Sequence, residues 1–144
     1  MEYKEKILEL AKSKPITPAE VASELKINLI LAAAILSELA SKKEIKISNL
    51  KVGSSPLYFL PGNEKQLLNF VEYLNEKELQ ALEFLKASRI VLEKDLDPLK
   101  RVCLRQIKDF ALPIEIEIDG RKSKGFKYFE LDDDEFIYWI KTFD

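Results

Sequence analysis

The first part of the chain arranges apolar and polar residues at the spacing of α-helices. This spacing predicts three helices, at residues 3–13, 18–25 and 29–41. The second helix has a clear start signal, because Thr17 can cap it, Pro18 suits its first position and Glu20 can bond back to the cap. Asn28 can cap the third helix. Two short helices joined by a tight corner are typical of a helix-turn-helix.

After the third helix the pattern changes to the alternation of β-strands. Residues 44–48 alternate apolar and charged side chains and predict one strand, and residues 56–60 predict a second. Residues 49–55, which include Gly53, predict the turn between them. A further helix is expected at residues 63–74. The first part therefore ends in a hairpin followed by a helix.

The same order of elements returns in the second part of the chain. We expect helices at residues 77–87, 98–111 and 133–143, and strands at residues 114–118 and 126–131 joined by a turn at residues 119–125. Asp97 can cap the helix that begins at Pro98. Before this helix, residues 92–96 predict at most one helical turn, and residues 89–91 have the composition of a strand.

The two parts coincide in their apolar positions when the chain is shifted along itself by one constant offset. The matched pairs include Leu8 with Leu79, Ala11 with Leu82, Val21 with Leu92, Leu25 with Leu96, Leu36 with Ile107, Leu39 with Phe110, Ile45 with Ile116, and Leu60 with Leu131. Helix-spaced and strand-spaced segments match at the same offset, which indicates an internal repeat. We therefore expect two modules, at residues 1–75 and 76–144.

Three helices followed by a two-stranded hairpin resemble the winged-helix family. The resemblance rests on the segment TPAEVASELKIN, on the third helix of each module, and on the hairpins EIKISNLKVGSSPLYFL and IEIEIDGRKSKGFKYFEL. It covers nearly the whole chain, twice, and the turn VGSSPLYFLPG is similar to those of small archaeal winged-helix proteins. The expected fold class is α+β and helix-rich, with two winged-helix modules in tandem, each ending in a helix after its wing.

Composition argues against an enzyme and against a membrane protein. The 144 residues are 47% hydrophobic, which is enough for a core, yet they include no histidine and one cysteine. The commonest general base and the usual ligands of structural zinc are therefore missing, and we expect no catalytic residue, no metal site and no cofactor. Cys103 cannot form an intrachain disulfide, which suits the cytoplasm. No apolar run of 18 or more residues predicts a membrane span.

The resemblance implies nucleic-acid binding through the start of the third helix and through the wing. In the second module both segments are basic. The expected contact residues are Lys100, Arg101, Arg105, Gln106, Lys108, Arg121, Lys122 and Lys124. The spacing of Arg101, Arg105 and Lys108 predicts one stripe along the helix. We expect Arg101, Arg105 or Gln106 to reach bases and the remaining cations to contact phosphates.

The same helix has an alternative interpretation as an ordinary solvated surface. Its cations would then pair with nearby carboxylates, namely Glu93, Asp95, Asp97 and Asp109. Glu115 and Glu117 would share one face of the strand and repel phosphate, and the chain has a net charge of −2. The apolar positions Val102, Ile107 and Phe110, with Leu99, Cys103 or both, are expected to face the core.

The third helix of the first module lacks side chains that read bases. Residues 29–36 are apolar, so we interpret this helix as buried on several sides, with a partner subunit or the second module covering part of it. The alternative is a secondary phosphate contact through Lys42, Lys46 and Lys51. A homodimer or another protein partner is expected to bind through this module.

Two classes of function follow from these patterns. The first is binding of double-stranded DNA in transcription or chromosome maintenance; RNA is an open variant of it. The second is a protein-interaction subunit that resembles the tandem winged-helix subunits of ESCRT-II, of kite proteins and of basal transcription factors. Near the C-terminus, Asp132–Glu135 are expected to cap a helix rather than bind a metal. Phe136 and Trp139 are expected to serve as core or contact residues.

Overall fold

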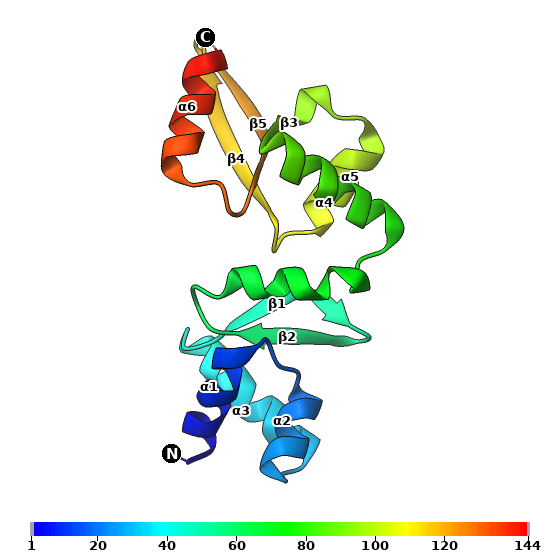
Figure 1. Cartoon of the computed structure of the whole chain (residues 1–144), viewed down its shortest axis with the longest axis vertical. Helices are drawn as coiled ribbons and strands as arrows, with labels where there is room; N and C mark the ends of the chain where they lie inside the picture. Colours follow the sequence, from blue (N-terminus) through cyan, green and yellow to red (C-terminus); the bar gives the residue numbers. More distant parts are fainter. Residues whose placement is uncertain (1, 144) are drawn as a thin grey trace. The chain divides into compact units, whose positions relative to one another are not determined.

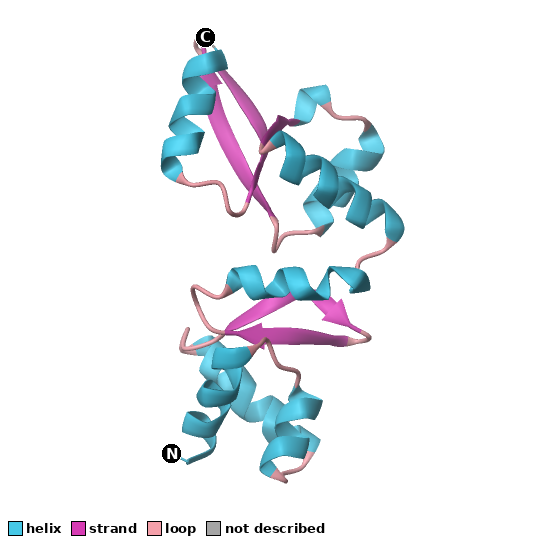
Figure 2. Cartoon of the chain, viewed as in Figure 1, coloured by secondary structure: helices cyan, strands magenta, loops and turns pink. Residues whose placement is uncertain are grey.

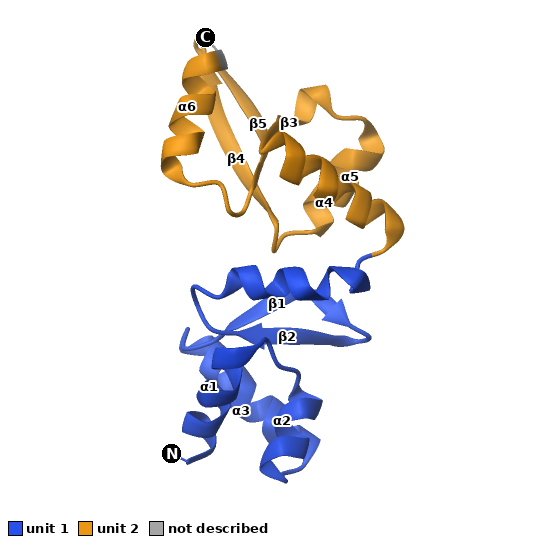
Figure 3. Ribbon diagram, in the orientation of Figure 1, with its two compact units in different colours: residues 1–74 blue, residues 75–144 orange. Residues whose placement is uncertain are grey.

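The protein belongs to the α+β class. The computed structural model describes residues 2–143, which form helices and two small antiparallel sheets (Figure 2). The chain divides into two compact units, Met1–Leu74 and Asn75–Asp144 (Figure 3). Asn75 belongs to the second unit because its side chain accepts a hydrogen bond from the Glu78 amide at 2.8 Å and thereby caps the helix that follows.

The first unit consists of three helices, a hairpin and a 3₁₀-helix (Figure 1). Its elements are α1 (Glu2–Ser13), α2 (Pro18–Leu25), α3 (Leu29–Ser41), β1 (Lys46–Val52), β2 (Ser55–Phe59) and η1 (Glu64–Tyr73). The predicted bounds of α2 and α3 are confirmed. The helix expected at residues 63–74 is a 3₁₀-helix instead. The hairpin turn is shorter than predicted, because β1 continues to Val52 and Gly53 turns the chain with a φ of +65°.

The corner between α2 and α3 is built by local hydrogen bonds. Thr17 accepts a bond from the Glu20 amide at 3.2 Å, and the Glu20 carboxylate accepts one from the Thr17 amide at 3.2 Å, which confirms the capping box. Lys26 ends α2 in the left-handed conformation. Asn28 then caps α3 by accepting a bond from the Leu31 amide at 2.7 Å. These caps set where both helices begin.

The core of the first unit gathers the inner faces of its three helices and the hairpin. Its fully buried members include Ile7, Ala11, Val21, Leu36 and Leu39. The chain between α1 and α2 also pairs with the hairpin: Ile16 and Tyr58 exchange two backbone hydrogen bonds of 2.9 and 2.7 Å.

The second unit follows a similar plan with a shorter second helical segment. Its elements are α4 (Glu76–Ser88), β3 (Ile90–Leu92), η2 (Glu93–Asp95), α5 (Pro98–Gln106), β4 (Ala111–Ile118), β5 (Arg121–Tyr128) and α6 (Asp133–Phe143). The predicted strand and the predicted single helical turn before Asp97 are therefore both present, as β3 and η2. The three strands lie in the order β3-β5-β4 (Figure 1).

Several predicted bounds in the second unit are wrong, and the strands expected at residues 114–118 and 126–131 are β4 (Ala111–Ile118) and β5 (Arg121–Tyr128). Helix α5 ends at Gln106 rather than at residue 111, because the Ile107 carbonyl accepts bonds from the amides of Phe110 and Ala111 in a tight turn, and β4 starts at Ala111. The hairpin turn is Asp119–Gly120 alone, since both residues have positive φ and close the hairpin in two residues. Residues 121–125 therefore lie in β5.

The internal repeat is visible in the burial of the matched residues. Leu36 and Ile107 are buried in their own units, and so are Leu39 and Phe110. The match fails in the second helical segment, where Val21 lies on α2 but its counterpart Leu92 lies on β3. The repeat therefore holds for the first helix, the third helix and the hairpin.

Candidate nucleic-acid interface

Lys100 lies in the first turn of α5 and is bonded to Asp97, the residue that caps this helix. The Asp97 carboxylate accepts hydrogen bonds from the Lys100 amide at 2.8 Å and from its ammonium group at 3.3 Å. The backbone bond, with the lysine side chain next, holds the pKa of Asp97 below its usual value. The Lys100 ammonium also lies 4.9 Å from the centre of the Phe84 ring on α4. Lys100 is thus positioned by two neighbours.

Both arginines of α5 contact Glu93 in η2. The Nε atom of Arg101 donates to the Glu93 backbone carbonyl at 2.7 Å, in a half-buried contact. The Nη2 atom of Arg105 donates to the Glu93 carboxylate at 3.0 Å. The predicted pairing of this helix with Glu93 is therefore found for Arg105. Arg101 and Arg105 lie on one stripe of the helix and are held against η2.

The predicted stripe does not extend to Lys108. Since α5 ends at Gln106, Lys108 lies in the turn before β4, where its side chain is exposed. Gln106 is exposed at the last position of the helix. The expectation that Arg101, Arg105 and Lys108 share one helical face is therefore wrong, and two of the three do so.

The inner face of α5 differs from the prediction. Cys103, Ile107 and Phe110 are buried as expected, and burial raises the pKa of the Cys103 thiol. Leu99 and Val102 are instead 53% and 48% exposed. Leu104 takes their place in the core. Ile107 and Phe110 reach the core from the turn that follows the helix.

The hairpin presents lysines and glutamates on the same face of the sheet. Glu115 pairs with Lys124 and Glu117 with Lys122 in the β4–β5 register, and the Lys122 ammonium lies 3.8 Å from the Glu115 carboxylate. Residues opposite each other in an antiparallel pair share a face. The acidic face that the sequence identified as an obstacle to phosphate is therefore the face that carries these two lysines. Arg121 lies next to the turn, opposite Ile118.

This hairpin face is charged and exposed near the turn and buried at the far end of β5, and the opposite face is buried at Ile116. Phe126 and Tyr128 follow Lys122 and Lys124 at every second position of β5, and both are buried. Side chains two residues apart in a strand point to the same side. Lys122 and Lys124 thus lie on the same side of the sheet as Phe126 and Tyr128, beyond the buried part of the strand.

The predicted secondary contacts in the first unit are dispersed. Lys42 pairs with Glu38 at 3.1 Å, one helical turn away. Lys46 and Lys51 are exposed near opposite ends of β1. The Glu38 carboxylate also binds Lys4 at 2.9 Å, and these lysines hold the pKa of Glu38 below its usual value. No clustered basic surface follows from these three lysines.

The start of α3 is exposed and apolar. Ala32, Ile35, Leu36 and Leu39 form its buried face. Leu29 and Leu31 are exposed, and Ile30 is 83% exposed. The first turn of the helix is therefore not covered by the rest of its own unit, and its cover by a partner subunit stays a prediction. The residues that follow the Asn28 cap are thus exposed, large aliphatic side chains.

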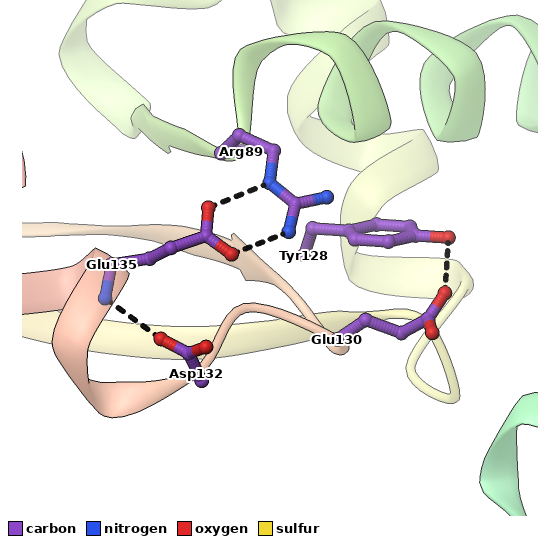
Figure 4. A network of polar contacts seen from close by, with 5 residues as sticks. All are labelled: Arg89, Tyr128, Glu130, Asp132 and Glu135. Carbon is purple, nitrogen blue, oxygen red and sulfur yellow. Dashed lines mark hydrogen bonds and ion pairs between the residues drawn. The ribbon is translucent and has the colours of Figure 1, made fainter.

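The remaining arginine anchors α6 to the sheet. Arg89 donates to the two carboxylate oxygens of Glu135 at 3.3 and 3.0 Å, and its guanidinium lies 5.2 Å from the centre of the Tyr128 ring (Figure 4). The Tyr128 hydroxyl donates to Glu130 at 3.2 Å. Burial, followed by the nearby Glu130 carboxylate, raises the pKa of Tyr128 to about 12. This cluster joins α6 to the end of α4 and to β5, and its residues are not among the predicted contacts.

The acidic start of α6 acts as a helix cap. The Asp132 carboxylate accepts a hydrogen bond from the Glu135 amide at 2.8 Å, which confirms the expected capping (Figure 4). Among the described residues, no group of three or more cysteine, aspartate or glutamate side chains could hold a metal ion. No helix within residues 2–143 is long and apolar enough to cross a membrane.

Comparison with known proteins leaves the family of this chain open. No protein-family model matches it, and no curated protein matches it. Among solved structures, a hypothetical protein of Pyrobaculum spherical virus is similar with a TM-score of 0.41 and 18% sequence identity, over 73% of this chain and 69% of the viral protein. The candidate interface therefore rests on the geometry of this chain alone.

Proposed function

We propose that this chain is a tandem winged-helix protein without enzymatic activity, whose second unit binds nucleic acid, with double-stranded DNA as the preferred partner. The order of elements supports the fold: three helical segments precede a two-stranded hairpin in each unit. In both units the chain after the first helix pairs with the second strand of the hairpin, through Ile16 in the first and β3 in the second.

One observation carries the nucleic-acid proposal. Lys122 and Lys124 lie on the same side of β5 as the buried Phe126 and Tyr128, and α5 holds Arg101 and Arg105 against Glu93 of η2, which contacts β5. A basic helix and a basic hairpin within one unit form a footprint of the kind that spans a groove and its flanking phosphates.

The ion pairs within this footprint do not prevent binding. Exposed ion pairs contribute about 0 to 1 kcal/mol, because water and salt screen them. A contact with DNA phosphate gains the release of condensed counterions, which an internal carboxylate does not offer. Arg105 and Lys122 can therefore exchange their glutamate partners for phosphates.

Double-stranded DNA is preferred over duplex RNA for a geometric reason. The major groove of B-DNA admits an α-helix, whereas that of A-form RNA is too deep and narrow for side-chain readout. Arg101, Arg105 and Gln106 are the candidates for base contacts. The lysines of the footprint, with Arg121, serve as phosphate contacts. Roles in transcription or in chromosome maintenance would follow from such binding.

The test is the fluorescence anisotropy of a labelled random duplex at about 50 and about 200 mM salt. Each phosphate contact should add a loss of about 3.5-fold in affinity between these two concentrations. Replacing Arg101 and Arg105 with alanine should weaken binding strongly. The matched control replaces Lys42 and Lys46 in the first unit and should change little. Absence of wild-type binding at the lower salt concentration, or equal losses in both double variants, would refute the proposal.

A second candidate function is favoured by the exposed start of α3. The first turn of this helix carries no charged side chain, and Leu29, Ile30 and Leu31 are all exposed. An apolar surface of this kind is typical of a protein contact. The candidate is a protein-interaction subunit, with a second copy of the chain as its first partner to be tested, because a two-fold axis places identical apolar residues against each other.

Sedimentation equilibrium of Ile30→Glu tests this candidate. The side chain is 83% exposed, so the substitution should leave the fold intact while it places a charge in the contact. A wild-type dimer that becomes a monomer supports the candidate. A wild-type monomer, or a dimer that the variant leaves unchanged, excludes self-association through this surface.

A further inference from the structure

Glu93 holds both arginines of α5 by two different groups. Its backbone carbonyl accepts the bond from Arg101, and its side-chain carboxylate accepts the bond from Arg105. A carboxylate resembles a phosphate as a partner for a guanidinium, since both present oxygen atoms with shared negative charge. The Glu93 carboxylate therefore occupies the place at Arg105 that a nucleic-acid phosphate would take.

We propose that Glu93 is a specificity-determining residue of the second unit, acting as an internal competitor that a phosphate must displace from Arg105. This inference rests on the proposed nucleic-acid function. A poorly placed phosphate displaces the carboxylate from Arg105 in only part of the complexes, because the exposed ion pair is weak but still competes, so nonspecific duplexes lose most from the competition. A duplex whose bases also bind Arg101 and Gln106 gains enough free energy to offset the loss of the bond between Glu93 and Arg105. Glu93 thus lowers general affinity and favours well-matched sites.

The position of Glu93 allows its two contacts to be separated. Glu93→Gln keeps the backbone carbonyl, so the bond to Arg101 and the packing of η2 against α5 remain. The same substitution removes the charge that pairs with Arg105. Any change in binding can then be assigned to the release of Arg105.

Asp95→Asn is the matched control. Asp95 lies in the same short 3₁₀-helix, its side chain is exposed, and the described residues show no ion pair for it. Both substitutions remove one negative charge from η2. A general charge effect therefore appears in both variants, whereas release of an arginine appears in Glu93→Gln alone.

The expected result is a change in affinity and in salt dependence. Glu93→Gln should bind a labelled random duplex more tightly than wild type at about 50 mM salt, and the slope of log affinity against log salt should steepen by up to about 0.9, because release of Arg105 completes at most one phosphate contact. That slope adds a loss of up to about 3.5-fold between about 50 and about 200 mM salt. Asp95→Asn should keep the wild-type slope. Adding Arg105→Ala to Glu93→Gln should remove the gain.

The outcomes separate this inference from the proposed function. If wild type and variants all fail to bind at the lower salt concentration, the nucleic-acid function itself is wrong. If wild type binds but Glu93→Gln and Asp95→Asn share its slope, the competitor role is overturned and the binding function stands. Circular dichroism checks that each variant folds. Should Glu93→Gln not fold, Glu93→Asp, which keeps the charge but shortens the side chain, should show a smaller gain; an unchanged affinity there would also overturn the inference.

Discussion

The contact between β3 and β5 depends on the absence of a side chain at Gly125. A Cβ atom placed on this residue would lie 2.1 Å from the carbonyl oxygen of Val91 and 3.0 Å from the Cα atom of Leu92. Both obstacles are backbone atoms of the paired strand, so no side-chain rotation can relieve the overlap. Gly125→Ala should therefore force β3 and β5 apart and destabilise the second unit.

The size of the effect follows from the nature of the obstacle. Overpacking a well-packed interior costs about 1 to 3 kcal/mol, and a clash with backbone belongs at the upper end. Separation of the strands would also begin to expose Ile90, Val91 and Leu92, which are all buried. We expect a loss of about 3 kcal/mol, which is a large share of the stability of a small domain. The urea midpoint should then fall by about 2 to 3 M.

The assay uses the single tryptophan of the chain. Trp139 lies on α6 in the second unit, so its fluorescence during urea unfolding reports on that unit. The control is Gly120→Ala, where a Cβ atom meets nothing within 4 Å but the backbone has a φ of +77°. That variant should lose about 1 to 2 kcal/mol through backbone strain alone. A midpoint for Gly125→Ala at or above that of Gly120→Ala would refute the close approach of the two strands.

Three further predictions concern single contacts. Thr17→Ala removes the cap of α2 and should lower the stability of the first unit by about 1 kcal/mol in urea unfolding followed by circular dichroism; an unchanged midpoint would contradict the capping role. Glu135→Gln breaks the exposed ion pair with Arg89 and should lower the free energy of unfolding of the second unit by at most about 1 kcal/mol. Urea unfolding followed by Trp139 fluorescence measures this loss, and a larger loss would show that the pair is more than a surface contact. The pKa of Tyr128 is raised to about 12, above the value near 10 of an unfolded tyrosine, so its contribution to stability is complete below about pH 10 and is lost as pH rises toward about 12. A pH titration followed by tyrosinate absorbance should show one phenol that ionises near pH 12, and a Tyr128→Phe variant should lack this step.

Helix starts were predictable from sequence because their signals are local. Thr17, Glu20 and Asn28 form their caps with residues three positions away, so the bounds of α2 and α3 follow from short segments. The end of α5 has no such signal. Cys103, Ile107 and Phe110 keep helical spacing whether the chain continues as a helix or turns, and no glycine or proline marks the stop. All three residues are buried although the helix stops at Gln106, so their apolar spacing could not identify where the helix ends.

The partners of the basic residues required the tertiary structure. The sequence placed Arg101 and Arg105 on one helical stripe, and this relation depends on helix geometry alone. Their common contact with Glu93 depends on how η2 packs beside α5, which no spacing encodes. The hairpin differs, because the alternation of Glu115 and Glu117 already identified their shared face. The register then showed that Lys122 and Lys124 lie on it.

The two units differ at matched positions of the third helix, and this difference assigns the two candidate functions to different units. Under the constant offset that relates the two units, Ile30 corresponds to Arg101 and Ala34 to Arg105. The same two positions on the third helix are thus aliphatic in the first unit and cationic in the second. An aliphatic pair cannot neutralise phosphate, and a pair of arginines is unsuited to an apolar contact unless it is neutralised. Binding of nucleic acid and association of chains should therefore be lost separately: Ile30→Glu should leave the affinity of each chain for DNA unchanged, and the Arg101 and Arg105 double variant should leave the oligomeric state unchanged.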